Sequence, residues 1–100
     1  MKRDEIIETL QARAADLRTR GVAHAALFGS RARGEDRPNS DTDIMIDIDS
    51  AAEATMTVYD YVALKRYIAS LFDGRVDVVD RQALKPHLRS RAESDAVYAF

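Results

Sequence analysis

Hydrophobic residues recur at helical spacing near the start of the chain. They are Ile6, Ile7, Leu10, Ala14 and Leu17. Separations of three and four positions place such residues on one face of a helix. Acidic residues precede this stretch and arginines close it, as the helix dipole favours, and Gly21 follows as a stop signal. We therefore predict one amphipathic helix over residues 3–20.

Three shorter apolar runs are typical of strands. Residues 22–28 (VAHAALF) are bounded by glycine on both sides, which indicates a buried strand. In residues 43–49 (DIMIDID) isoleucine alternates with aspartate or methionine, which predicts a strand with one buried and one polar face. Asp47 and Asp49 on that polar face are expected to be solvated. Residues 76–80 (VDVVD) predict a third strand.

Two further helices and a tail complete the pattern. Residues 57–72 predict a helix that is closed by Gly74. Residues 82–93 predict another, with Pro86 in its first turn, where proline is tolerated. The expected apolar side of the first of these helices consists of Val58, Tyr61, Val62, Ile68, Ala69 and Phe72. Residues 97–100 fit either an edge strand or a packed tail.

The order of these elements predicts a small α/β (α+β) fold. A strand, a helix and a second strand in succession form a crossover unit, so the strands at 43–49 and 76–80 are expected to be parallel neighbours. The expected order is helix, strand, helical turn, strand, helix, strand, helix, which gives a mixed sheet flanked by helices. No repeat or linker divides the sequence, so we expect a single domain over residues 1–100.

Composition narrows the possible functions. The formal net charge of −2 gives no general attraction to nucleic acid, so we expect no direct nucleic-acid binding. The chain has no cysteine, which excludes disulfides, thiolate metal sites and cysteine nucleophiles. Its charged first residues and the lack of a long apolar stretch predict no signal peptide, no membrane contact and a cytoplasmic location.

A polar connection, residues 29–40 (GSRARGEDRPNS), follows the first predicted strand. Gly29 and Ser30 lead into a predicted turn of helix over residues 30–34. A glycine lets a phosphate approach the backbone closely, and the free N–H groups at a helix start attract anions. The stretch is neither a Walker A loop, which needs Lys-Ser/Thr after the glycines, nor a dinucleotide fingerprint. A Gly-Ser pair by itself also fits an ordinary turn.

Carboxylates give a stronger signal. Asp41 and Asp43 are two positions apart, so on a strand they share a face about 6.6 Å apart. Asp77 is central in the valine-rich strand expected beside them, where an unpaired buried carboxylate would need a partner or a metal. Clustered carboxylates fit a pair of Mg²⁺ or Mn²⁺ ions, although a merely acidic sheet edge explains the same residues. An EF-hand is excluded, because Ile44 and the residues after it provide no glycine turn and no terminal glutamate.

Together these motifs resemble the DNA polymerase β-like nucleotidyltransferase superfamily, and most closely its minimal nucleotidyltransferase (MNT) antitoxins, which act beside HEPN-domain toxins. The resemblance rests on the Gly-Ser pair, ten residues, the Asp-Thr-Asp triplet and the later strand aspartate, and it covers nearly the whole chain. It implies that Gly29 and Ser30 bind the triphosphate of ATP. It also implies that Asp41 and Asp43 coordinate two Mg²⁺ ions. Asp77 would coordinate the catalytic ion and help to deprotonate the attacking hydroxyl.

Charge adds Arg31 and Arg33 to the candidate site. Three carboxylates facing a triphosphate bring together about seven negative charges, of which two Mg²⁺ ions would offset four. We therefore predict that both arginines bind nucleotide, with ordinary surface positions as the alternative. The resemblance implies attack on the α-phosphate, with AMP passing to a hydroxyl of a partner HEPN toxin and pyrophosphate leaving. Two alternatives stay open: an antitoxin that neutralises by binding alone, and a nucleotidyltransferase for small molecules.

Overall fold

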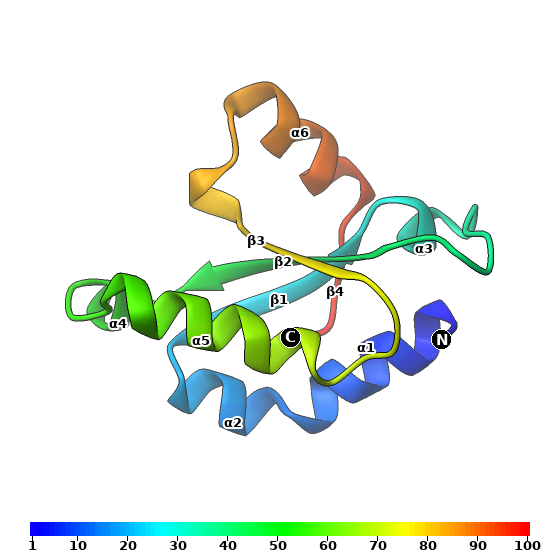
Figure 1. Cartoon of the computed structure of the whole chain (residues 1–100). Coiled ribbons are helices and arrows are strands. Elements are labelled where there is room, and N and C mark those ends of the chain that lie inside the picture. Colours follow the sequence, from blue (N-terminus) through cyan, green and yellow to red (C-terminus); the bar gives the residue numbers. More distant parts are fainter.

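A four-stranded sheet forms the centre of the computed structural model, which describes all 100 residues (Figure 1). The strand order is β3-β2-β1-β4; β1 runs antiparallel to β2 and β4, and β2 runs parallel to β3. The predicted mixed sheet and its parallel pair are confirmed. The tail of the chain is a short edge strand over residues 97–98, after which Ala99 and Phe100 pack on the core. The strands are β1 (Val22–Phe28), β2 (Thr42–Ile48), β3 (Val76–Asp80) and β4 (Val97–Tyr98).

Helices cover both faces of the sheet. Three of them, α1, α2 and α5, pack on one face and α6 packs on the other (Figure 1). The helices are α1 (Arg3–Ala12), α2 (Ala14–Thr19), α3 (Ser30–Arg33), α4 (Ser50–Glu53), α5 (Val58–Ala69) and α6 (Pro86–Asp95), with a 3-10 turn η1 (Arg81–Ala83). The larger core includes Ile6, Leu10, Leu17, Ile44, Ile46, Leu64 and Ile68. None of the helices has the length and apolar composition that crossing a membrane requires.

Several helix boundaries differ from the predicted ones; the helix expected over residues 57–72, for example, ends at Ala69. The helix expected over residues 3–20 is interrupted at Arg13, whose backbone angles of φ −102° and ψ 7° separate α1 from α2. The apolar residues on both sides of the break still face the sheet, so the predicted buried face is correct. The helix expected over residues 82–93 begins later, because the chain first forms η1. Pro86 then takes the first position of α6, where its missing N–H costs no helical hydrogen bond.

The prediction that one face of β2 is polar and solvated is wrong, because α6 covers part of that face. Met45 is buried there against Ala26 of β1 and Ala92 of α6. Asp47, on the same face, is not solvated: its Oδ1 lies 2.5 Å from Nε of Arg81. An alternating pattern indicates which residues share a face of a strand, but it does not reveal a helix that packs there from a distant part of the chain.

Asp49 lies beyond β2 rather than within it. Its exposed side chain accepts a hydrogen bond from the N–H of Ala51 at 2.8 Å and so caps α4. The hydrophobic pattern gave no indication of this single turn of helix. Asp49 is therefore at the surface, as predicted, but it has a structural role there.

The apolar side predicted for α5 is partly wrong. Leu64, Ile68 and Phe72 are buried at four-residue spacing, whereas Val58 and Val62 are exposed. The apolar residues of this helix lie on two sides, and only one side can pack on the sheet. Two valines that looked like core residues are therefore at the surface.

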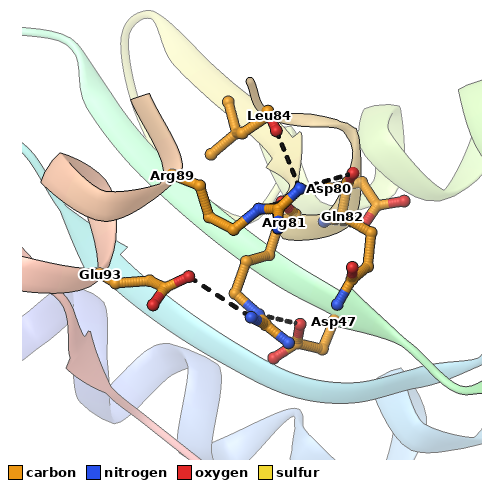
Figure 2. A network of polar contacts seen from close by, with 7 residues as sticks. All are labelled: Asp47, Asp80, Arg81, Gln82, Leu84, Arg89 and Glu93. Carbon is orange, nitrogen blue, oxygen red and sulfur yellow. Dashed lines mark hydrogen bonds and ion pairs between the residues drawn. The ribbon is translucent and has the colours of Figure 1, made fainter. Parts of the chain in front are cut away.

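A charged network fixes α6 beside the sheet (Figure 2). Arg81 contacts Asp47 of β2 and also lies 3.4 Å from the carboxylate of Glu93 in α6. Arg89 donates to three backbone carbonyls in and beside η1. Only three buried apolar residues form the core beneath α6, so these polar contacts contribute to holding the helix in position.

Candidate functional site

The Gly-Ser turn and two of the predicted aspartates meet where β1, β2 and β3 lie side by side. Gly29 connects β1 to α3, and the residue before it, Phe28, is the register partner of Asp43 in the antiparallel β1–β2 pair. In the parallel β2–β3 pair, Asp43 is the register partner of Asp77. Neighbouring strands lie about 4.8 Å apart. The topology thus brings together three positions that are far apart in the sequence.

Asp43 lies against the Gly29 turn. Gly29 has a φ of 76°, and a Cβ added there would lie 2.3 Å from Oδ2 of Asp43, so glycine leaves the room that this carboxylate occupies. The pKa of Asp43 is raised, first by burial and then by the negative charges of Asp77 and Asp41. The charges of the other two aspartates therefore act on the partly buried carboxyl group of Asp43.

Asp41 and Asp77 are less enclosed than Asp43. Asp41 precedes β2, and its Oδ1 lies 3.6 Å from Nε of Arg75; both side chains are exposed, so this ion pair is weak. Asp77 is exposed on the edge strand β3, so the expectation that its burial would demand a partner is wrong. In this conformation no three acidic or histidine side chains form a ready-made ion site.

Arg31 holds the loop between α3 and β2. Its guanidinium is buried and donates to the carbonyl of Met1 at 3.0 Å and to the carboxylate of Asp36 at 3.1 Å. A third bond, of 2.6 Å, runs from Nη2 to the carbonyl of Ser40. Arg31 is thus tied to the chain segment that leads directly into Asp41. The sequence did not indicate this role, because two of the three acceptors are backbone carbonyls.

Arg33 lines an open hollow of about 280 Å³ beside Gly29 and Asp77. Its guanidinium lies 2.6 Å from Asp95 of α6 and 2.9 Å from Glu35. The opposing charge of Arg33 also moderates the raised pKa of Asp43. Larger hollows beside α2, at the N-terminus and along α5 contain none of the three aspartates.

Helix α6 supplies one wall of this hollow. Sequence reasoning missed this contribution; of the two leucines that line the wall, Leu88 lies on α6 and Leu84 just before it. Arg91 also lines the hollow and makes no ion pair within the chain. The apolar lining consists of Phe28, Val79, Leu84, Leu88 and Ala92. The hollow therefore combines an apolar wall with two carboxylates, those of Asp77 and Asp95, and two guanidinium groups.

Comparison with known proteins gives consistent matches over nearly the whole chain. Residues 5–98 match the family described as polymerase beta, nucleotidyltransferase. Protein adenylyltransferase MntA of Thermococcus cleftensis is 33% identical over 96 residues, which are 95% of this chain and 93% of that protein. A solved structure described as a minimal nucleotidyltransferase is 32% identical, with a TM-score of 0.68, and the match covers 97% of this chain and 95% of the other.

A further match is a complex from Shewanella oneidensis, in which a tri-AMPylated HEPN toxin is bound to an MNT antitoxin. The identity is 20% and the TM-score 0.63, over 94% of this chain and 71% of the matched chain. At this identity the likeness shows the fold alone. The mixed sheet with helices on both faces is thus a fold that these solved structures share.

Proposed function

The chain belongs to the polymerase β-like nucleotidyltransferase family, and from that premise we propose that it transfers AMP from ATP to a hydroxyl of a partner HEPN-type toxin and so acts as its antitoxin. The observation that carries the proposal is the convergence of Asp43, Asp77 and the Gly29 turn at one place on the sheet. The choice of nucleotide follows the Thermococcus cleftensis relative, which is named a protein adenylyltransferase. The choice of acceptor follows the Shewanella oneidensis complex, which shares the fold and in which the HEPN toxin carries AMP.

We propose that the three aspartates hold two Mg²⁺ ions, with Mn²⁺ as a substitute, although their side chains do not form a ready-made ion site in the free chain. Carboxylate oxygens are the ligands that these ions prefer. A cation beside Asp43 would offset the cost of burying its charge and the repulsion from the other aspartates, the two causes that raise its pKa. Asp41 would give up only its weak ion pair with Arg75 in order to bind a metal ion. When bound, Mg²⁺ supplies positive charge that neutralises the triphosphate and the attacking oxygen.

The Gly-Ser turn is proposed to hold the triphosphate. The N–H groups in the first turn of α3, which begins at Ser30, have no acceptor within the helix. Gly29 presents no side chain to an approaching phosphate. Arg33 lies beside it and would exchange its exposed ion pairs with Glu35 and Asp95 for the phosphate. Arg31 is proposed to contribute by holding the loop before Asp41 rather than by direct contact, because both terminal nitrogens of its guanidinium already donate hydrogen bonds within the chain.

Asp77 is proposed to receive the proton of the attacking hydroxyl. It lies on the exposed edge strand and lines the hollow through which an acceptor side chain can reach the site. Asp43 is its register partner on β2. The carboxylate proposed to serve the acceptor and the one proposed to serve the triphosphate would therefore lie on adjacent strands. A carboxylate within hydrogen-bond reach of the hydroxyl is the geometry that general-base catalysis requires.

Replacing Gly29 with alanine is expected to lower nucleotide affinity by about tenfold or more, because the new Cβ displaces the carboxylate of Asp43. Gly34 provides a matched control: its φ is 74°, and an added Cβ there meets no atom within 4 Å. The Gly34 change costs about 1–2 kcal/mol, because φ 74° with ψ 20° is the left-handed helical region, whereas Gly29, with ψ −156°, lies in a region that only glycine adopts readily and is strained more by the change. Calorimetric titration with ATP and Mg²⁺ should therefore be carried out well below the melting temperatures of both variants, so that it compares folded chains. Equal ATP affinities for Gly29→Ala and Gly34→Ala would contradict the role given to the contact with Asp43.

The proposed reaction is tested directly by incubating the chain with ATP labelled in its α-phosphate and with a HEPN-type protein, to be sought in the reading frame beside its gene. We expect the label on the HEPN protein in the presence of Mg²⁺, and none when the metal is chelated. Mass spectrometry should locate one AMP group for each modified hydroxyl. Neutralisation of the toxin without any label, with or without ATP, would instead support an antitoxin that works by binding alone.

A further inference from the structure

One side of α5 carries an apolar stripe that nothing in the chain covers. Val58, Tyr59 and Val62 are 77%, 87% and 42% exposed, and they are three of the six large apolar residues exposed in the whole chain. With Ala63 and Arg66 they line a shallow depression along the helix. We call these five residues the α5 stripe. An exposed apolar patch with a charged edge is typical of a protein interface.

The helix that carries the stripe is fixed at both ends. At its start, Thr57 and Asp60 form a reciprocal capping box, with hydrogen bonds of 3.0 and 3.1 Å. Near its end, the hydroxyl of Tyr67 bonds to Asp16 of α2, and the guanidinium of Arg20 lies 3.8 Å from the centre of the Tyr67 ring. The stripe is therefore preformed, which lowers the entropy cost of binding a partner.

The order of residues along the stripe is complementary to itself in the antiparallel direction. In a symmetric pair the same surface is used by both copies. With the two-fold axis between Val62 and Ala63, these small residues meet their counterparts at the centre. Arg66 of each copy then lies over the Tyr59 ring of the other, which is the arrangement of a cation–π contact.

Charge also suits this pairing. No ion pair engages Arg66 within the chain, so its guanidinium is free for a contact with another copy. The two Arg66 residues would lie about 10 Å apart along the helix axes, at opposite ends of the interface. No like charges are therefore brought together at its centre.

We propose that the α5 stripe is the interface of a symmetric homodimer in which the two α5 helices pack antiparallel. The stripe belongs to the helices on one face of the sheet, whereas α6 on the other face lines the hollow beside Asp77 (Figure 1). Pairing through the stripe leaves the candidate site of each copy open, so the inference is independent of the transfer activity. One helix pair buries less than the roughly 1,600 Å² of a standard interface, and the dimer is accordingly a reversible one.

Sedimentation equilibrium over a wide range of protein concentration tests the dimer. The apparent mass should rise with concentration from 11.2 kDa toward twice that value. Val62→Glu brings two carboxylates together at the axis and should weaken association by about tenfold or more. Leu88→Glu makes a comparable change at an equally exposed residue of α6, 43% against 42%, and should leave association unchanged. A wild-type chain that stays monomeric, or equal effects of the two changes, would overturn the proposal.

Exchanging the residues at the ends of the stripe tests the antiparallel arrangement itself. Tyr59→Arg alone places two positive charges opposite each other and should weaken the dimer. The double change Tyr59→Arg with Arg66→Tyr restores an aromatic ring opposite each guanidinium, so association should return toward the wild-type value. A double variant that associates as weakly as the single one would overturn the antiparallel pairing.

Discussion

Replacing Asp41 and Asp43 together with asparagine is expected to abolish the Mg²⁺-dependent part of ATP binding and to lower AMP transfer by at least about 10³-fold. Amide side chains keep the shape of the two carboxylates but remove the charge that the ions need. Calorimetric titration of ATP with and without Mg²⁺ gives the measurement. The metal should raise the affinity of the wild-type chain and have no effect on that of the variant.

A matched control removes two carboxylates outside the site. Asp4→Asn with Asp49→Asn changes the net charge by the same amount at exposed positions, and asparagine can still cap α4. This control should bind ATP with the wild-type dependence on Mg²⁺. If the Asp41/Asp43 variant binds ATP as the control does, with the same response to metal, these aspartates do not form the metal site.

The same Asp41/Asp43 variant should be more stable than the wild-type chain when no metal is present. Because the folded state raises the pKa of Asp43 above its ordinary 3.8, ionised Asp43 is less favourable in the folded chain than in the unfolded one. Stability is therefore greatest below the unfolded pKa and falls as pH rises through the raised value. At neutral pH asparagine removes this cost and should raise the melting temperature by on the order of a few degrees. Near pH 3, roughly, the gain should disappear, because the carboxyl is protonated in both states.

The strands could be predicted from the sequence where short apolar runs end at glycine or polar residues. The limits of β1 and β3 were predicted correctly for this reason. The burial of Met45 and the exposure of Val58 and Val62 could not be predicted in the same way. Each depends on which side of a strand or helix another element packs against, and two apolar sides of one helix look alike in a periodic pattern.

Some features of the candidate site could likewise be predicted from the sequence, and others could not. The spacing of the Gly-Ser pair and the Asp-Thr-Asp triplet indicated the kind of chemistry, and the parallel pairing predicted from the crossover placed Asp77 beside Asp43. The surroundings of Arg31 could not be foreseen, because its acceptors include the backbone carbonyls of Met1 and Ser40. The position of α6 as a wall of the hollow could not be predicted either, because it depends on contacts between elements that are distant in the chain.

The Asp77→Asn variant is expected to bind ATP with Mg²⁺ but to transfer AMP about 10²-fold or more slowly than the wild-type chain. Asp77 lines the hollow that we propose the acceptor enters, whereas the carboxylate of Asp43 lies against the Gly29 turn. The two residues should therefore divide the work between proton removal and triphosphate binding. ATP affinity from calorimetry and initial rates of label transfer to the HEPN protein measure the two parts separately.

Folding provides no alternative explanation for such a loss of rate. The side chain of Asp77 is exposed and makes no hydrogen bond or ion pair within the chain, so its replacement should leave the melting temperature close to that of the wild type. Asp80→Asn is the matched control, because Asp80 lies on the same strand and caps η1 through the N–H of Gln82, which asparagine can also do. The control should transfer AMP at nearly the wild-type rate. An Asp77→Asn chain that is equally active would make Asp77 an ordinary strand residue, and with it the case for an antitoxin that neutralises by binding would become the stronger one.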